Sequence, residues 1–328
     1  NKSHRPLSLT CTLSGLFAFK EKNMDTVKPF LSIDDQIKLL KKRKLTINDD
    51  QYEKAKEFLL NNNYYRISGY SLTLRQNDTF FESASLETLI QIYEADRRMR
   101  HIMLSVIEAV EVRIKSMIAY FHSEKYGPLG YLDINNFCCT NNGKIDLPII
   151  ENYLYIARKA DNQKNAMTES ELFLKHHKEN KNDILPFWVY VEVLTISDAS
   201  KLYTILDEEL RKTIALHLGF TSNNRHKIVE NLLHCITILR NICAHGGRLY
   251  NRLFTRKPWL SKKEKNLLRV ENGHKVYDKL FSYILVLKSI TLPQDFKLVV
   301  EHITQIKEQY PLVDFKHYGF PENWQEIL

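Results

Sequence analysis

The sequence is poor in cysteine and lacks the spaced ligand pairs from which zinc sites are built. Five cysteines occur among 328 residues, an odd number, and Cys138 and Cys139 are adjacent, so a disulfide framework is not expected. No C-x2-C or H-x3-H pair is present, which argues against a zinc site. The sequence therefore predicts a protein that needs neither disulfides nor a metal, and no cofactor is expected.

Glycine and proline are also scarce, with 10 and 9 copies. Because these residues interrupt helices, their scarcity and the long stretches with an apolar period near 3.5 predict a mostly helical, all-α protein. The longest apolar runs are far shorter than the ~20 residues that span a bilayer. We therefore expect no membrane association and a cytoplasmic location. A chain of this length fits one large domain or two closely packed domains.

Basic residues exceed acidic ones by 47 to 39, which gives a formal net charge of +8. This balance favours a polyanionic partner without requiring one, because many ordinary proteins share it. Basic residues cluster locally at 38–44, at 97–100 and between 240 and 263. The third cluster surrounds the candidate site described below and suits contacts with RNA phosphates. A solvated basic face is an equally good interpretation of its charge alone.

The longest predicted helix begins after Ser85 and extends to about residue 123. Its apolar stripe alternates steps of three and four residues, as in a coiled coil. Two charged residues interrupt the stripe, Asp96 and Arg100, with the acid four residues before the base. An ion pair within a packing stripe costs desolvation, so we predict that it fixes helix register or positions a neighbouring helix without taking part in catalysis. The stripe consists of Leu86, Leu89, Tyr93, Asp96, Arg100, Met103, Ile107, Val110, Ile114, Met117 and Phe121.

A second amphipathic helix is predicted to begin after Ser222 and to end with the segment RNICAH at 240–245. At ~100° per residue, Asn241 and His245 fall together on the face opposite the apolar stripe. His245 is therefore not expected to be a core histidine. The following pair of glycines, 246–247, would let the chain turn sharply and present the histidine at the helix end. The stripe consists of Ile228, Leu232, Cys235, Leu239 and Ile242, with steps of 4, 3, 4 and 3.

Arg240, Asn241 and His245 are residue types that suit RNA cleavage without a metal. An imidazole titrates near neutral pH, so it can take a proton from a ribose 2′-hydroxyl or give one to a leaving oxygen. A guanidinium stays charged and holds a phosphate at two points, which stabilises the transition state. The pattern R-x4-H is weak by itself, because chance and buried histidines also produce it.

The segment RNICAHGGRLYNR at 240–252 resembles the C-terminal signature of the Abi_2 family, the AbiD/AbiF-like abortive-infection proteins. That family belongs to the HEPN superfamily of helical ribonucleases. Together the similar segments cover roughly residues 28 to 255 in the family's order, which is far more specific than one R-x4-H. One departure is Gly246, where the family usually has a bulky polar residue, and this change is expected to loosen the loop. The further similar blocks lie at 28–32, 63–70, 93–100, 107–113 and 185–189.

The resemblance implies an HEPN-like helical bundle with an additional N-terminal helical region and a long central helix. It also implies a metal-independent endoribonuclease that acts on RNA in anti-phage abortive infection. HEPN nucleases pair two motifs across a two-fold interface, so a homodimer is expected to bring both copies of Arg240 and His245 into one cleft. Asn241 would orient the histidine or a phosphate oxygen. Further contacts to RNA are expected from Arg248, Asn251 and Arg252.

The pattern of predicted helices and connectors along the sequence divides the chain into five regions. They are a leader or extension (1–27), an N-terminal helical region with the long central helix (28–135), a loop and polar connector (136–184), an HEPN-type region with R-x4-H (185–292), and a C-terminal helix and tail (293–328).

Two other functions stay open. The chain could be a non-catalytic RNA-binding or RNA-regulated component of a toxin–antitoxin-like defence system. It could also be a protein-only toxin or antitoxin component in which Asn241 and His245 line an interface. Substitution of His245 separates the first alternative from a nuclease, because a binding module keeps its RNA affinity.

Overall fold

The structure is a computed structural model that describes residues 28–137, 140–141 and 144–328. The leader expected at 1–27 lies outside the described residues. Contacts within the chain divide it into two compact units, one that ends at Leu86 and one that extends from Glu87 to Leu328. Each unit buries apolar residues of its own.

The first unit is helical and contains one short hairpin. Ser32 begins the first helix, because its hydroxyl accepts the Asp35 N–H at 3.2 Å and satisfies a donor that the helix leaves unpaired. The tyrosine-rich block forms a helix of its own, which Asn63 caps by accepting the Tyr65 N–H at 2.9 Å. The elements are α2 (Ile33–Lys42), α3 (Tyr52–Asn62), α4 (Tyr64–Tyr70), β1 (Arg75–Gln76) and β2 (Thr79–Phe80).

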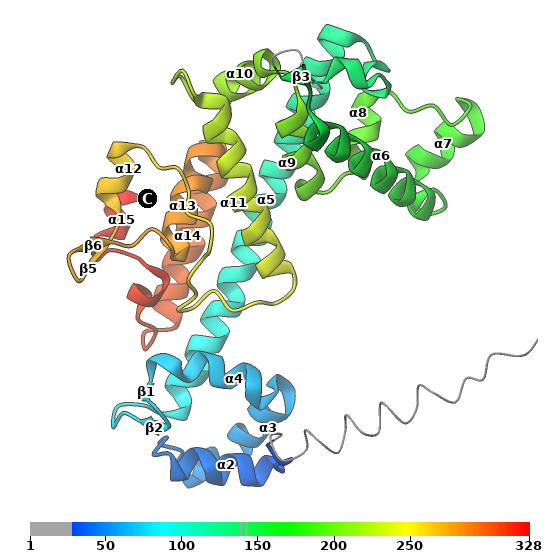
Figure 1. Ribbon diagram of the computed structural model, residues 1–328. Coiled ribbons are helices and arrows are strands. Elements are labelled where there is room, and N and C mark those ends of the chain that lie inside the picture. Colours follow the sequence, from blue (N-terminus) through cyan, green and yellow to red (C-terminus); the bar gives the residue numbers. More distant parts are fainter. Residues whose placement is uncertain (1–27, 138–139, 142–143) are drawn as a thin grey trace, which may run out of the picture. The chain divides into compact units, whose positions relative to one another are not determined.

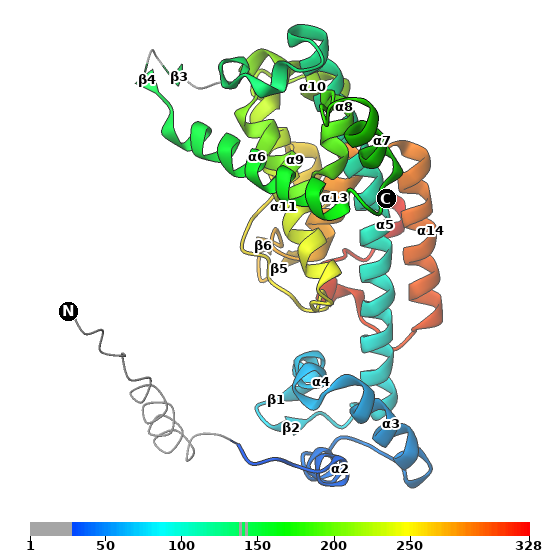
Figure 2. The same cartoon turned by 90° about the vertical axis from the view of Figure 1, so that its right-hand side faces the viewer.

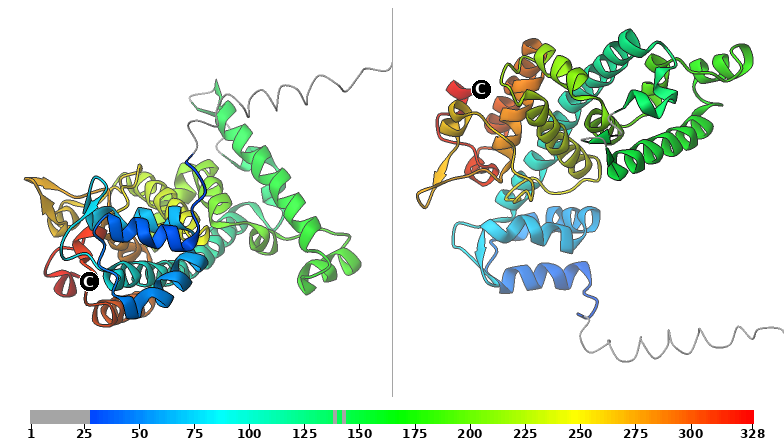
Figure 3. Two further views of the ribbon diagram at one scale, coloured as in Figure 1. Left: turned by 90° about the horizontal axis from the view of Figure 1, so that it is seen from below. Right: turned by 45° about the horizontal axis from the view of Figure 1, so that its top comes forward.

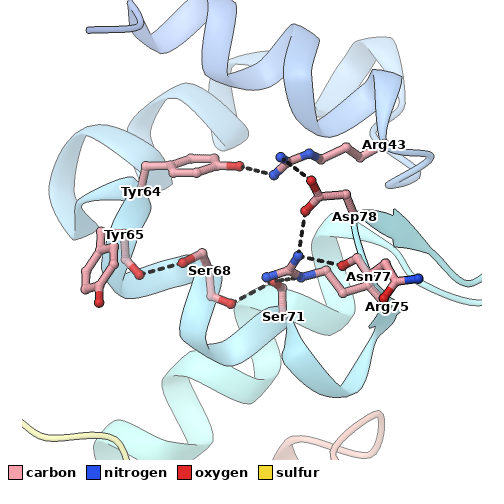
Figure 4. A network of polar contacts seen from close by, with 8 residues as sticks. All are labelled: Arg43, Tyr64, Tyr65, Ser68, Ser71, Arg75, Asn77 and Asp78. Atoms are coloured by element: carbon pink, nitrogen blue, oxygen red, sulfur yellow. Dashed lines mark hydrogen bonds and ion pairs between the residues drawn. The ribbon is translucent and has the colours of Figure 1, made fainter. Parts of the chain in front are cut away.

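Asp78, in the turn between β1 and β2, joins two arginines of this unit (Figure 4). Arg43 donates to the Asp78 carboxylate at 3.0 Å and Arg75 donates at 3.1 Å. Arg43 also donates to the Tyr64 hydroxyl at 3.1 Å, which links the hairpin to α4. Because Asp78 is 71% exposed, each ion pair contributes at most about 1 kcal/mol, and the network orients the hairpin more than it stabilises the unit.

The second unit is built from helices and two short antiparallel hairpins, so the predicted all-α fold class is confirmed. The hairpins are β3 (Thr140–Asn141) with β4 (Lys144–Ile145) and β5 (Val270–Glu271) with β6 (His274–Lys275). The helices are α5 (Leu86–Tyr126), α6 (Leu147–Met167), α7 (Leu172–Asn180), α8 (Phe187–Tyr190), α9 (Ile196–Ile205), α10 (Glu208–His217), α11 (Arg225–Ala244), α12 (Lys262–Leu267), α13 (Leu280–Ile290), α14 (Pro293–Gln309) and α15 (Trp324–Ile327).

The long helix α5 confirms the predicted central helix and most of its stripe. The stripe is buried from Leu86 to Ile114, but its last two members, Met117 and Phe121, are only half-buried. Ile118 and His122 are buried in their place. A straight α-helix drifts by about 20° per heptad against a seven-residue repeat, so a stripe extrapolated over this length leaves the buried face.

Helices α5, α11, α13 and α14 run alongside one another in the second unit (Figures 1 and 2). Helix α13 contacts both α11 and α14, and it buries residues on every face, including Leu280, Ile284 and Leu287. A helix that is apolar all round must be enclosed by neighbours, which explains its central place. None of the helices in the described part of the chain is long and apolar enough to cross a membrane.

The region expected as a loop and polar connector, 136–184, contains the two helices α6 and α7. Figure 3 shows α6 leading out to α7. Few residues of these helices are buried, among them Ile156, Ala160 and Leu174, so their sequences are mostly polar and resemble that of a connector. Asp146 begins α6 by accepting the Ile149 N–H, and a proline follows in the first turn, where it needs no helical partner.

An aromatic cluster fixes the C-terminal segment. Phe315, Tyr318, Phe320 and Trp324 are all buried. The ring of Phe320 lies 4.9 Å from that of Phe281 on α13 and 5.3 Å from that of Trp324. These four aromatic residues therefore belong to the core of the second unit.

His122 is fully buried on α5 among aromatic rings. Its ring lies 4.8 Å from Phe187, 4.9 Å from Tyr126 and 5.1 Å from Phe137. Neither ring nitrogen has a hydrogen-bond partner among the described residues. Burial lowers the pKa of His122 to about 4, and the Asp207 carboxylate opposes this shift only in part. The imidazole is therefore neutral in the folded protein at neutral pH.

We predict that this histidine weakens the fold in mild acid. Between pH 6.5 and about 4 the unfolded chain binds a proton at His122 that the folded chain does not. The free energy of unfolding therefore decreases as the pH is lowered through this window, and it levels off below pH 4. The expected loss is about 1–3 kcal/mol. It is measured by urea unfolding at a series of pH values.

His122→Phe removes the titrating imidazole, so the free energy of unfolding of this variant should depend less on pH between 6.5 and about 4. His101→Phe, at an exposed position on the same helix, is the matched control and should leave it unchanged. An equal pH dependence in His122→Phe and the parental protein would contradict the prediction.

Candidate functional site

The R-x4-H segment forms the end of α11. The helix begins at Arg225, so the prediction that it starts after Ser222 is wrong by two residues. The Ser222 carbonyl instead accepts the Arg225 N–H at 3.1 Å, in a turn that precedes the helix. Leu232, Cys235 and Leu239 of the predicted stripe are buried, and the other two members are partly buried.

Arg240, Asn241 and His245 lie away from this stripe. Asn241 and His245 are exposed and Arg240 is half-buried, so the predicted placement of these side chains outside the core is confirmed. A guanidinium nitrogen of Arg240 donates to the Asn241 side-chain oxygen at 3.4 Å, which brings these two polar groups together. The imidazole is thus accessible to a ligand.

Two backbone hydrogen bonds close the helix immediately after the histidine. His245 is the C-cap residue, the Gly246 N–H donates to the Cys243 carbonyl at 3.0 Å, and the Gly247 N–H donates to the Ile242 carbonyl at 2.7 Å. This pair of bonds is the Schellman motif, which requires a left-handed residue after the cap. Gly246 has φ +64°, a conformation that glycine adopts without strain. The glycine therefore ends the helix in a sharp turn, as predicted from the pair at 246–247.

The three residues expected to contact RNA lie in the loop that follows. Arg248 donates to the Tyr250 carbonyl, and Arg252 donates to the Arg248 carbonyl, so the structure brings these two arginines together. Asn251 has φ +52°, and its N–H donates to the His317 carbonyl at 3.2 Å. All three residues are half-buried. Their guanidinium and amide groups thus take part in the shape of the loop.

The buried side chain of Asp96 binds the backbone of this loop. Its fully buried carboxylate accepts the Tyr250 N–H at 2.7 Å and the Leu249 N–H at 3.2 Å. It also accepts the Tyr318 hydroxyl at 3.2 Å and forms an ion pair with Arg100, which is itself buried. A buried carboxylate needs several donors to offset its lost hydration, and here a loop, a tail residue and its own helix supply them. Asp96, which was predicted to fix helix register together with Arg100, therefore also binds the loop that follows the R-x4-H segment.

The thiols on α11 are poor nucleophiles. Burial, with the Asp96 carboxylate nearby, raises the pKa of Cys243 to about 12. Burial raises the pKa of Cys235 to about 11. A thiol reacts as the thiolate, which is scarce for both groups at neutral pH. Among the residues that the structure describes, no group of three His, Cys, Asp or Glu side chains could hold a metal ion.

A groove of about 690 Å³ lies beside the first half of α11. Its walls include Ile228, Lys257, Trp259 and Lys265, and the Trp259 side chain is half exposed. Asn231, which is buried, accepts the Trp259 N–H at 2.8 Å and thereby fixes the loop that carries the tryptophan. The groove thus combines aromatic side chains with two ammonium groups and one carboxylate, that of Glu264.

Several residues that shape the site could not be identified from local sequence patterns. Tyr318 lies 222 positions after its partner Asp96, and no local pattern connects them. His317 packs its ring 5.2 Å from that of Tyr250, and burial lowers the pKa of His317 to about 4. Asn231 could have been noticed, because it is a polar residue one turn before Cys235 on the buried stripe.

Comparison with protein families gives one match to this region. A family model described as Abi-like protein matches residues 57–251, more than half of the chain. The matched segment includes α5 with Asp96, and α11 with the complete R-x4-H segment. Comparison with curated proteins and with solved structures gave no match.

We predict that Asp96→Asn destabilises the second unit by roughly 3–5 kcal/mol, the usual effect of removing one partner from a buried pair. The amide would place an N–H₂ group against the donors of Arg100 and the loop. Urea unfolding measures the loss, and hydrogen exchange should show faster exchange of the Leu249 and Tyr250 amides.

Glu94→Gln, two residues before Asp96 on the same helix, removes a partly exposed ion pair to Arg97 and should change stability by less than about 1 kcal/mol. Tyr318→Phe removes one donor from the Asp96 carboxylate and should cost about 1 kcal/mol. Equal stability of Asp96→Asn and Glu94→Gln would show that the loop does not depend on the carboxylate.

Proposed function

The chain belongs to the Abi-like protein family, and from this membership we propose that it acts in abortive-infection defence as a metal-independent endoribonuclease of the HEPN type. The observation that carries the proposal is the exposed His245 at a rigid helix end, beside Asn241 and Arg240. Imidazole, amide and guanidinium groups at an accessible position suit proton transfer to and from a phosphodiester.

The proposed reaction is transphosphorylation within the RNA. His245 takes the proton of a ribose 2′-hydroxyl, and the 2′-oxygen bonds to the adjacent phosphorus as the bond from phosphorus to the 5′-oxygen breaks. A proton donated to the leaving 5′-oxygen completes the exchange, so the products carry a 2′,3′-cyclic phosphate and a 5′-hydroxyl. Arg240 stabilises the charge on the phosphate oxygens, and Asn241 orients the histidine or one of these oxygens.

One chain supplies one histidine from this motif, whereas the reaction uses a base and an acid. We therefore place the active centre at a two-fold axis of a homodimer, where His245 of the partner subunit serves as the second proton-transfer group. The exposure of Asn241 and His245 supports this arrangement, because both side chains are free of the core and can face a second copy.

RNA contacts in this proposal extend along α11. Arg256, Lys257, Lys262 and Lys263 are exposed and supply positive charge to phosphates. Trp259 in the neighbouring groove offers a face on which an unpaired base can stack. Arg248, Asn251 and Arg252 contribute through the loop, where their positions are already fixed by hydrogen bonds.

We predict that His245→Ala and Arg240→Ala each abolish RNA cleavage and cellular toxicity while leaving the fold intact. Loss of a proton-transfer group should lower the rate by ~10²–10⁴-fold. The measurement uses purified protein with total cellular RNA and with single-stranded oligoribonucleotides. Kinase labelling of the new 5′ ends detects the expected 5′-hydroxyl products.

His234→Ala, at an exposed position on the same helix, is the matched control and should cleave at the parental rate. EDTA should leave cleavage unchanged, whereas complete inhibition reversed by a divalent metal would indicate a two-metal mechanism. Cleavage by His245→Ala at the parental rate would refute the site. RNA binding by a parental protein that cleaves nothing would instead support the RNA-binding component of a toxin–antitoxin-like system.

The composite site gives a second prediction. His245→Ala and Arg240→Ala subunits are each expected to be inactive as homodimers. A co-refolded mixed dimer keeps one His245 and one Arg240 but lacks the second imidazole, so it should recover only a small part of the parental activity, with water as the second proton-transfer group. The measurement is the cleavage rate of the mixture against that of each parent at equal total concentration, with the oligomeric state read by light scattering.

A mixture of two copies of the same variant is the control and should stay inactive. A protein that is monomeric while it cleaves RNA would exclude the shared cleft, although it would leave His245 as a candidate base.

A further inference from the structure

A second cavity lies in the other half of the second unit and takes no part in the proposed cleavage. It measures about 240 Å³ and lies between α6, α9 and the segment that contains α8. Five aromatic side chains contribute to its wall, namely Tyr131, Phe137, Tyr153, Phe187 and Tyr190. This volume is smaller than that of a drug-sized site and suits a group the size of a side chain.

The rings of this wall are held in place. Tyr131 stacks on the buried Phe187 with centroids 5.0 Å apart and planes inclined by 13°, and Tyr190 lies 4.4 Å from Tyr131. The Tyr131 hydroxyl donates to the Leu185 carbonyl at 2.7 Å, and the Tyr153 hydroxyl lies 3.1 Å from the Tyr131 carbonyl. A wall fixed in this way loses little freedom when a ligand enters.

The charged residues that line the cavity are Asp161, Lys164 and Asp183. Lys164 forms an ion pair with Asp183 at 2.6 Å, so these two charges offset each other. Asp161 is exposed, and its carboxylate makes no hydrogen bond or ion pair with any described residue. Burial, aided by the charge of Asp161, raises the pKa of Tyr131 to about 12, which is consistent with a carboxylate close to these rings. Two carboxylates and one ammonium leave the lining with a net charge of −1 in a chain of net charge +8.

We propose that this cavity binds a guanidinium group, stacked against the tyrosine rings and paired with the Asp161 carboxylate. The faces of aromatic rings attract cations, and a planar guanidinium also stacks on them. The same group can make two parallel hydrogen bonds to a carboxylate. A neutral planar group would gain nothing from the charge of the Asp161 carboxylate, and an anion would be repelled by it. The guanidinium could belong to a small metabolite or to an arginine side chain of a partner protein, since the chemistry is the same.

The test is calorimetric titration of the full-length protein with two pairs of ligands that differ in charge but hardly in shape. Butylguanidinium and butylurea represent the free small molecule. Blocked Gly-Arg-Gly and Gly-citrulline-Gly peptides represent a side chain within a protein. We expect at least one guanidinium ligand to bind at least tenfold more tightly than its neutral counterpart. Tighter binding of butylguanidinium indicates a metabolite, and tighter binding of the peptide indicates a protein partner.

Variants locate the binding. Asp161→Asn keeps the shape of an exposed side chain and should weaken binding at least tenfold. Glu151→Gln, an exposed acid on the same helix outside the cavity lining, is the matched control and should bind as the parental protein does. Thermal unfolding checks that both variants remain folded. Equal binding of the charged and neutral ligands, unchanged binding by Asp161→Asn, or no saturable binding of either guanidinium would each overturn the proposal.

Discussion

The geometry of the candidate site depends on one buried carboxylate. Asp96 gathers donors from three segments that are distant in the sequence: its own helix, the loop at 249–250 and the tail at Tyr318. Burying a carboxylate is costly, so its interactions stabilise the fold only while its donors remain in place. The requirement couples the segments, because displacing one of them leaves a charge inadequately satisfied in the core. The loop after the R-x4-H segment therefore cannot shift without affecting the central helix.

The side chains proposed to take part in the reaction, in contrast to Asp96, are exposed or only half-buried. His245 is exposed, yet its backbone is held by the Schellman bonds on one side and by α11 on the other. A catalytic group needs a fixed backbone and an accessible side chain, and precise sites depend on the residues that support them. The division has a practical consequence. Substitution of His245 tests the chemistry, whereas substitution of Asp96 tests the position of the loop.

Local features of this structure could be predicted from the sequence, and non-local ones could not. Helix periodicity placed Asn241 and His245 opposite the apolar stripe, because this placement depends only on residues a few positions apart. The pair Asp96 and Arg100 was visible for the same reason. Its loop partners were not, since Leu249 lies 153 positions away and offers only a backbone N–H, which every residue but proline has. Extrapolation also failed at Met117 and Phe121, where a small angular error per turn accumulates over a long helix.

The two sites that we propose have opposite electrostatic character, although one helix connects their surroundings. Helix α9 contributes Leu202 and Ile205 to the aromatic cavity and packs against α11, which carries the R-x4-H segment. The surface near α11 is rich in exposed lysine and arginine and attracts phosphates, whereas the cavity lining is net negative and attracts a cation. RNA and a guanidinium ligand therefore do not compete for the same groups. Added salt should weaken RNA binding strongly, because many counterions are released, but it should weaken the single guanidinium contact to the exposed Asp161 carboxylate less, because only one pair of charges is screened.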